Sequence, residues 1–273
     1  MLDCMPLSSQ LKCPDMHPWQ EFNPTPDYFA SRVYLVTGAG QGLGEAVAKM
    51  LAAAGATVVL LGRNEKKLAR VYDAIEAAGG PTPAAIPVDL AAMTDQDCVN
   101  LANLVWKEFD RLDGIIHCAN GFSHLSALVS QKLEEWVEMY RANVAAPFAV
   151  TRACLPLLKR AEDAAVIFVG EQHGIEPRAY WGGFATTRAA QAALATIAAD
   201  EWDKAPMPRV NLLVPGAVHT PFRTTTHPGE GKDNLPRPDD FAQAVGWLLS
   251  TAGQVHRGET MYFNPPAVDA DEE

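Results

Sequence analysis

The stretch Thr37-Gly38-Ala39-Gly40-Gln41-Gly42-Leu43-Gly44 decides the fold, because it joins a β-branched run to an amphipathic one. The residues around it predict a buried strand over Val33–Thr37 and a helix over Leu43–Ala54. Its glycines let the backbone turn tightly and approach a pyrophosphate, whose charge a helix N-terminus stabilises. The spacing is T-G-x-x-x-G-x-G, with Leu43 where a G-x-G-x-x-G turn has its last glycine. The stretch therefore predicts a dinucleotide-binding turn of a distinct kind.

The rest of the chain continues this alternation of strand and helix. Strands are predicted at Val33–Thr37, Ala56–Leu61, Ala84–Val88, Gly114–Cys118, Ala165–Val169, Arg209–Val214 and Thr260–Phe263. Helices are predicted at Leu43–Ala54, Glu65–Ala78, Asp95–Phe109, Leu133–Lys159, Gly183–Trp202 and Asp239–Leu249. Such alternation is typical of βαβ units around a parallel sheet. We expect an α/β, doubly wound Rossmann fold, with a seven-stranded parallel sheet and three helices on each face.

The length of 273 residues is enough for one sizeable core, and we expect one dinucleotide-binding domain over residues 31–264. Residues 1–30 are expected to form a partly disordered N-terminal extension. Its first 15 residues lack the pattern of a signal peptide, and Met16 is an equally good natural start. Residues 265–273 are expected to form a disordered acidic tail. The connection Ala217–Pro238 is expected to be an unstructured, mobile substrate lid.

Composition excludes several classes of protein. The chain has 22 basic and 33 acidic residues, a net charge of −11, which disfavours nucleic-acid and anionic-membrane partners. The apolar stretch Leu51–Leu61 is interrupted by Gly55 and is shorter than the roughly 20 residues of a membrane span. The five cysteines form no CxxC pair or Cys/His cluster, so reduced thiols and no metal site are expected. We expect a cytoplasmic protein.

The end of the second predicted strand reads Leu61-Gly62-Arg63-Asn64. An NAD-selective protein presents a carboxylate there to the ribose 2′-hydroxyl. Arg63 instead offers a fixed positive fork to a 2′-phosphate, which favours NADP(H) over NAD(H). The alternative is that Arg63 is an ordinary solvated arginine.

From Ser31 to Asn264 the order and spacing of motifs resemble the short-chain dehydrogenase/reductase family. Three segments, 60–68, 111–114 and 180–183, resemble bacterial YciK-type oxidoreductases within it. The resemblance implies that Asp89-Leu90 holds the adenine ring and that Pro215-Gly216 with Thr220 holds the nicotinamide carboxamide. The cofactor contacts expected by this resemblance are Thr37, Gly38, Gln41, Gly42, Leu43, Gly44, Arg63, Asp89, Leu90, Ala119, Arg188, Pro215, Gly216 and Thr220. Without the resemblance, Asp89 would be interpreted as a helix cap.

The family's catalytic tetrad is degenerate in this chain. Family members interconvert carbonyls and alcohols by hydride transfer, with a tyrosine moving the proton, a lysine lowering its pKa and a serine binding the substrate oxygen. Asn143 matches the tetrad asparagine, but the other three positions are Glu171, Phe184 and Arg188. Phe184 has no ionisable proton, and an ionised Glu171 repels negative charge developing on a carbonyl oxygen. Arg188 keeps a positive charge that can still bind the nicotinamide ribose.

Three side chains near the same strand end could substitute as proton donors: Tyr180, His173 and Glu171. Tyr180 precedes Phe184 by four residues, so it would share a helix face with Phe184 if the helix has begun there. The alternative is that Tyr180 and Trp181 are packing or substrate-loop aromatics. The loop after the fourth strand is also altered, with Cys118-Ala119-Asn120 where the family has N-A-G, and Cys118 is most simply a packing residue.

Two functional hypotheses follow. In the first, the chain binds NADP(H) without the family chemistry and acts as a sensor or regulatory subunit. In the second, it is an active NADPH-dependent reductase that uses a substitute proton donor or solvent on a small carbonyl or alcohol substrate. The family also pairs its fourth and fifth helices across a two-fold axis, and Ala185–Ala199 is rich in alanine. A homodimer or homotetramer is therefore expected.

Overall fold

The computed structural model describes residues 18–264. Its centre is one sheet of parallel strands in the order β3-β2-β1-β4-β5-β6-β7. The strands are β1 Val33–Thr37, β2 Thr57–Gly62, β3 Ala84–Pro87, β4 Gly114–His117, β5 Ala165–Val169, β6 Arg209–Gly216 and β7 Thr260–Asn264. The order turns back between β1 and β4, which is the switch point where such sheets bind ligands at their carboxyl ends. The predicted doubly wound Rossmann fold is confirmed.

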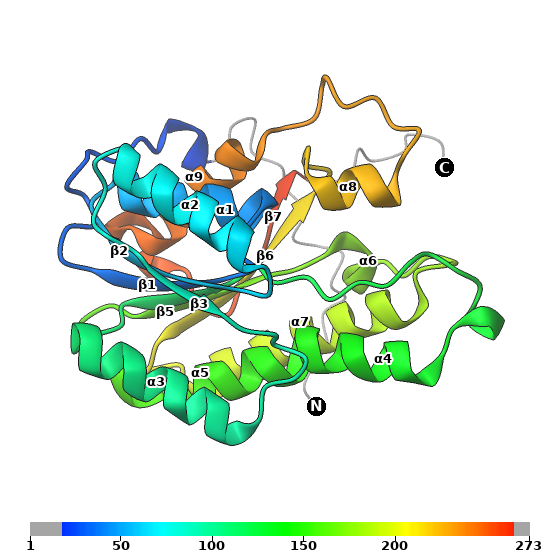
Figure 1. Cartoon of the computed structure of the whole chain (residues 1–273), viewed down its shortest axis with the longest axis horizontal. Helices are drawn as coiled ribbons and strands as arrows, with labels where there is room; N and C mark the ends of the chain where they lie inside the picture. The colour runs from blue at the N-terminus through cyan, green and yellow to red at the C-terminus, as the bar shows by residue number, and fades with distance from the viewer. Residues whose placement is uncertain (1–17, 265–273) are drawn as a thin grey trace, which may run out of the picture.

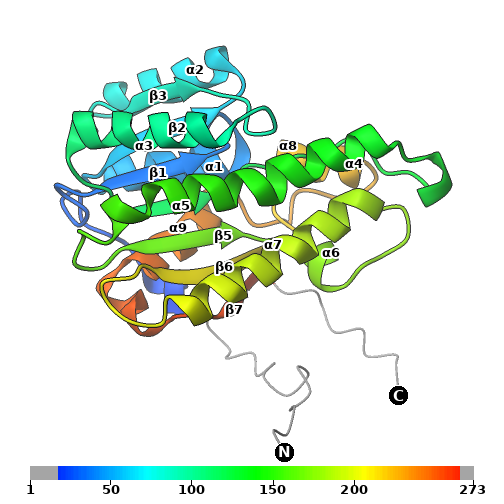
Figure 2. The ribbon, with the colours of Figure 1, turned by 90° about the horizontal axis from the view of Figure 1, so that it is seen from below.

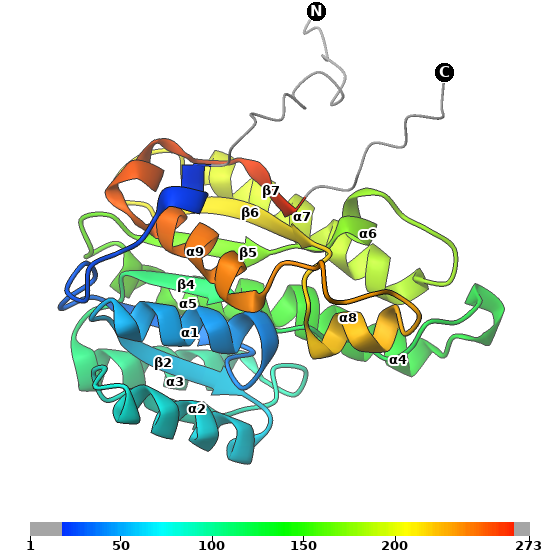
Figure 3. The ribbon, with the colours of Figure 1, turned by 90° about the horizontal axis from the view of Figure 1, so that it is seen from above.

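Helices cover both faces of the sheet (Figure 1). On one face lie α1 Gly42–Ala53, α2 Glu65–Ala77 and α9 Pro238–Leu249, which are nearest the viewer in Figure 3. On the other lie α3 Asp95–Phe109, α5 Ala146–Leu158 and α7 Gly182–Glu201, which are nearest in Figure 2. Of the helices in the described residues, none has the length and apolar character to cross a membrane.

Burial follows from this layering. The strands β1, β4 and β5 are buried along their whole length, because helices cover them from both sides. One apolar cluster joins α1, α2 and α9 to the sheet through residues such as Leu51 and Phe241. A second joins α3, α5 and α7 through residues such as Val105 and Leu158. This two-sided core fixes the strand ends, from which the functional loops emerge.

The helix predicted over Leu133–Lys159 is divided in the structure. It consists of α4 Leu133–Tyr140, a π-helical turn Arg141–Ala145, and α5 Ala146–Leu158. A π-helical turn inserts an extra residue into the helix, and such turns often mark functional sites. This one contains Asn143.

Two further segments differ from the sequence-based prediction. The connection Ala217–Pro238, predicted to be unstructured, contains the helix α8 Pro221–Thr226, which starts with a Thr220 side-chain cap. A short helix, α6 Gln172–Ile175, follows β5. Proline at the first helical turn and the Thr220 cap favour α8, and neither signal depends on apolar periodicity.

Residues 18–30 lie against the domain. Trp19, in the 3-10 turn Pro18–Glu21, packs edge-on against Trp247 of α9, with ring centroids 5.9 Å apart. Phe29 is fully buried beside Tyr34 of β1. The first 17 residues and the predicted acidic tail, 265–273, lie outside the described residues.

Candidate cofactor and active site

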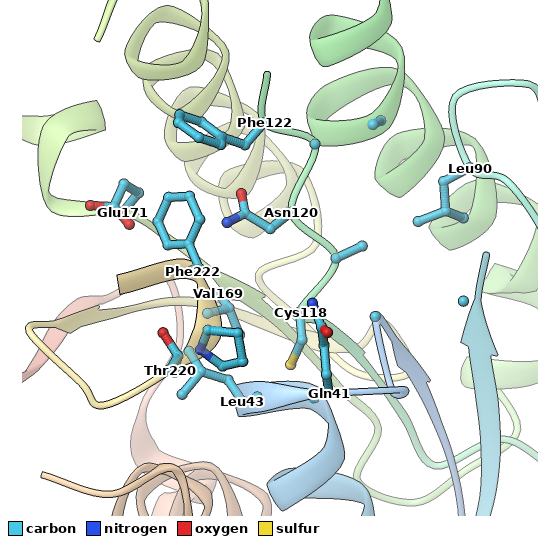
Figure 4. A pocket seen from close by; sticks show the side chains of 18 of the residues that line it. Gln41, Leu43, Leu90, Cys118, Asn120, Phe122, Val169, Glu171, Thr220 and Phe222 are labelled. Atoms are coloured by element: carbon cyan, nitrogen blue, oxygen red, sulfur yellow. The ribbon is translucent and has the colours of Figure 1, made fainter. Parts of the chain in front are cut away.

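A cavity of about 710 Å³ opens at the carboxyl ends of the strands. It extends from the glycine turn and Leu90 to a wall that carries Glu171, Phe122 and Phe222 (Figure 4). Of the predicted cofactor contacts, Gly38, Gln41, Gly42, Leu43, Gly44, Arg63, Asp89, Leu90, Ala119, Arg188, Pro215, Gly216 and Thr220 line it. Thr37 lies behind the wall, where its Oγ1 accepts a hydrogen bond from the Ala119 backbone N–H at 3.1 Å. The structure thus brings together residues from across the sequence.

The glycine turn has the geometry that its composition requires. Gly38 and Gly42 have φ of +67° and +60°, in the left-handed region that favours glycine. A Cβ on Gly44 would lie 2.4 Å from the carbonyl oxygen of Gly38, so a larger residue would separate helix α1 from the turn. The turn therefore leaves the first backbone N–H groups of α1 beside the cavity, as an anion site requires.

Basic side chains lie at the end of β2. Arg63 is exposed, with 65% of its side chain accessible, and its Nη1 is 4.0 Å from Oε1 of Glu138 on α4. Lys67 also lines the cavity, and its ammonium donates to the side-chain oxygen of Gln41. Asn64 caps α2 by accepting from the Lys67 N–H at 3.0 Å. Sequence reasoning missed Lys67, although its position one turn into α2 directs it back toward the β2 end.

Asp89 lines the cavity and does not cap a helix, because Thr94 caps α3. Its carboxylate accepts from the Ala91 N–H at 3.1 Å, as a turn cap does, and it also lines the cavity next to Leu90. On the opposite side, a Cβ on Gly216 would lie 1.8 Å from the carbonyl oxygen of Asn264. Gly216 therefore keeps the Pro215 segment close to β7 while it borders the cavity.

Asn143 is fully buried in the π-helical turn and does not line the cavity. Its Oδ1 accepts from the Gly121 N–H at 2.7 Å, and its Nδ2 donates to the Gly121 carbonyl at 2.8 Å and to Thr187 Oγ1 at 3.0 Å. The whole carboxamide is thus used to hold the loop after β4 against α7. In this structure Asn143 positions the wall and does not reach the cavity.

Arg188 lies on α7 with only 4% of its surface exposed. Its guanidinium donates to the Gln191 side chain at 2.8 Å, to the Ala119 carbonyl at 3.1 Å and to Asn120 Oδ1. Burial lowers the pKa of Arg188 to about 10, and the carboxylate of Glu171 opposes this shift. Arg188 is therefore charged at neutral pH. Asn120 and Gln191, which the sequence did not single out as partners, occupy much of its donor capacity.

Phe184 is buried within an aromatic cluster on the substrate side. Its ring centroid lies 5.2 Å from that of Phe122, 5.4 Å from Phe222 and 5.8 Å from Trp181. Those three residues line the cavity, whereas Phe184 is 2% exposed and does not. The position from which a tyrosine would move a proton is therefore part of an apolar wall.

The three candidate proton donors are placed differently. Glu171 lines the cavity, and its Oε1 is 3.0 Å from Nδ1 of His173. The His173 ring stacks on Trp181 with centroids 3.6 Å apart. Tyr180 has a left-handed φ of 73°, is 63% exposed and precedes the start of α7 at Gly182. The condition for placing Tyr180 on the helix face of Phe184 is not met, and Tyr180 does not line the cavity.

Cys118 borders the cavity at the end of β4. Burial raises the pKa of its thiol to about 12, so the thiol stays protonated at neutral pH. A protonated thiol is a weak nucleophile. This agrees with its interpretation as a packing residue.

Comparison with known proteins identifies the family. A family model described as short chain dehydrogenase matches residues 32–231. The uncharacterized oxidoreductase YciK of Escherichia coli K12 is 33% identical over 89% of this chain and 96% of its own length. A solved structure from Pseudomonas syringae is 37% identical, with a TM-score of 0.84 over 89% of this chain and 99% of its own. A structure from E. coli CFT073, complexed with NADPH, is 33% identical, with a TM-score of 0.85 over 89% of this chain and 100% of its own. The chain belongs to the short-chain dehydrogenase/reductase family.

Proposed function

We propose that this chain binds NADP(H) and that its tetrad positions do not carry out the proton transfer of carbonyl reduction. The observation that carries this proposal is the burial of Phe184 among three other aromatic rings, where the family places a tyrosine. No pH change can give this side chain a proton to donate. The protein would then act as a cofactor-dependent sensor or regulatory subunit.

The cavity fits a phosphorylated dinucleotide. At Gly38 and Gly42 the turn has no side chains that would keep its backbone away from a bound pyrophosphate. Arg63 and Lys67 add positive charge at the β2 end. Arg63 would hold the 2′-phosphate, and the α1 N-terminus would hold the pyrophosphate. A bound nicotinamide would supply hydride chemistry at the other end of the cavity. The complex of the E. coli CFT073 relative with NADPH supports this choice of cofactor.

A second candidate is an active NADPH-dependent reductase with a substitute proton donor. The contact between Glu171 and His173 favours it, since a carboxylate that lines the cavity is bonded to a second group able to carry a proton. Glu171 is the donor better placed in this pair, because His173 does not itself line the cavity.

Titration with NADPH and then NADH, followed by tryptophan fluorescence, tests the proposal. Tighter binding of NADPH than NADH is expected, and failure of both to bind would refute it. Incubation with NADPH and quinones, diketones or aldehydes then separates the two candidates. No consumption above a heat-inactivated control is expected from the first, and consumption that Glu171→Gln abolishes would establish the second.

We also propose that two copies of the chain pair through the face formed by α4, α5 and α7. Five large hydrophobic residues on these helices are exposed: Leu133, Val137, Tyr140, Phe148 and Ile197. Exposed apolar surface is typical of protein–protein association sites. Light scattering should give a homodimer or homotetramer, and Val137→Asp should shift it toward monomer. A monomeric wild-type protein would refute this arrangement.

A further inference from the structure

The substrate end of the cavity is walled by flat rings. Phe122 and Phe222 meet edge to face, with centroids 5.2 Å apart, and Trp181 and Met139 complete the same apolar cluster. All four line the cavity. Ring faces carry partial negative charge, so such walls favour flat rings and cations.

Glu171 lines the same cavity and contributes a carboxylate to it; Figure 4 labels it together with Phe122 and Phe222. A carboxylate can only accept hydrogen bonds, so His173 carries its proton on Nδ1 and donates to Oε1 at 3.0 Å. Since His173 is itself stacked on Trp181, this bond fixes the carboxylate in orientation. Among the hydrogen bonds of residues 18–264, Oε2 of Glu171 has no donor, so it remains available to a ligand.

None of the basic side chains near Glu171 forms an ion pair with it within 4.0 Å among the described residues, apart from the contact with His173. Arg223 of α8 is paired with Glu230 through two contacts of 2.6 Å. Burial and the neighbouring Arg223 lower the pKa of His227, which keeps it neutral at pH 7. Arg188 remains charged, and its charge attracts Glu171, although no ion pair within 4.0 Å joins the two among the described residues. The hydrogen bonds of Arg188 to Ala119, Asn120 and Gln191 hold the guanidinium on its own side of the cavity wall.

We propose that the substrate end of the cavity binds a planar organic cation, and that its reducible substrate is an iminium ion. Aromatic faces and a fixed carboxylate are complementary to a flat positive charge. The inference rests on the NADP(H) binding proposed above and gives the chain a catalytic role in place of the role of a sensor or regulatory subunit. An iminium ion is a substrate whose reduction requires no proton, so the loss of the family's tyrosine does not prevent this reaction.

Reduction of an iminium ion by hydride requires no proton donor. Hydride from the dihydronicotinamide adds to the iminium carbon, forming a C–H bond, and the C=N π pair becomes the nitrogen lone pair. The products are a neutral amine and the oxidised cofactor, and no proton is consumed. Reduction of a carbonyl instead makes an alkoxide that needs a proton, which Phe184 cannot give. The carboxylate of Glu171 would repel the negative charge of an alkoxide, whereas it attracts the positive charge of an iminium ion that binds in the cavity.

Binding is tested first, without turnover, by calorimetry on the full chain. The matched probes are N-methylquinolinium and quinoline, which is neutral at pH 7.5 to 8 and has almost the same shape. We expect the cation to bind about tenfold more tightly. Glu171→Gln should remove this preference, whereas Glu176→Gln, which changes an exposed carboxylate of the same segment, should keep it. Equal affinity for the two probes, or an unchanged preference in Glu171→Gln, would overturn the proposal.

Turnover is tested with 2-methyl-3,4-dihydroisoquinolinium, an iminium salt that cannot lose a proton from nitrogen. Consumption of NADPH above the heat-inactivated control, with appearance of the tertiary amine, is expected. Charge-selective binding with no consumption would overturn the assignment of a reducible substrate. If NADPH does not bind while the cation does, the proposed cofactor function fails and the cation site stands, so the two failures are distinguishable.

Discussion

The guanidinium of Arg188 donates from Nη2 to the side-chain oxygen of Asn120, which lies 68 residues earlier in the chain. The same guanidinium donates from Nη1 to Gln191, one turn further along α7. Arg188, which occupies the position of the family's lysine, therefore belongs to a hydrogen-bond network with Asn120 and Gln191. Changes to the tetrad positions must take these partners into account.

Arg188→Lys should lower the stability of the fold. A lysine has one donor group in place of the planar fork, so it cannot serve all three acceptors, and the buried side chain of Gln191 or the partly buried carbonyl of Ala119 would lose its donor. The free energy of unfolding should fall by about 1–3 kcal/mol. Urea denaturation measures it, with Arg160→Lys, an exposed arginine, as the control. An unchanged midpoint for Arg188→Lys would mean that the network does not contribute to stability.

The same network predicts the behaviour of a restored tetrad. Glu171→Ser with Phe184→Tyr and Arg188→Lys should remain nearly inactive toward diketones, because Asn120 would then compete for the lysine. The new tyrosine would also stay behind Phe122 and Phe222. Adding Asn120→Gly should raise the rate of NADPH oxidation above that of the triple variant. Family-like activity in the triple variant would contradict this explanation.

The ion pair between Arg63 and Glu138 predicts cofactor selectivity. Glu138 lies 4.0 Å from Arg63 and would compete with a 2′-phosphate for it. Glu138→Gln should therefore tighten NADPH binding by up to about threefold, since exposed ion pairs are worth up to about 1 kcal/mol. Arg63→Ala should weaken NADPH binding about tenfold and leave NADH unchanged. Fluorescence titration measures both cofactors, and an equal loss for NADH would show that Arg63 does not recognise the phosphate.

His117 predicts a pH dependence of stability. This residue of β4 is buried, with Nε2 2.8 Å from Thr151 Oγ1, and burial lowers its pKa to about 3. Between pH 6.5 and 3 the unfolded chain binds the extra proton, so the free energy of unfolding falls as the pH is lowered, by at most about 1.4 kcal/mol per pH unit. His117→Gln should show a shallower decline over this range. The exposed His124→Gln is the control and should follow the wild type; parallel curves for His117→Gln would refute the prediction.

Arg209 predicts the effect of breaking a buried ion pair. Its Nε lies 2.8 Å from Oδ1 of Asp163, and its Nη1 donates to the carbonyls of Leu248 and Gly253. Arg209→Met leaves these acceptors without a donor and should cost about 3–5 kcal/mol of stability. Thermal unfolding of the variant should show the loss, whereas Lys204→Met, at an exposed pair, should change stability by less than about 1 kcal/mol. A similar small change in both would show that the Arg209 pair is energetically neutral.

Much of the fold could be predicted because its signals are local. Apolar runs located every strand, and β1 and β5 have the predicted bounds. The π-helical turn around Asn143 was not predictable in this way, because apolar periodicity continues through it and long-range bonds to Gly121 and Thr187 accompany it. The helix α8 was missed because capping and packing define its six residues, which are too few for a periodic signal.

The sequence by itself determined the family, the glycine turn and the absence of an ionisable group at Phe184, since these depend on residue identity and short spacing. The tertiary structure alone decided which side chains surround that position. Only the folded chain brings Phe122 and Phe222 against Phe184, places Glu171 in the lining of the same cavity and leaves Tyr180 exposed outside that lining. The physical reason is that spacing along a chain fixes neighbours within a helix or strand, whereas neighbours across a cavity depend on how separate strand ends meet.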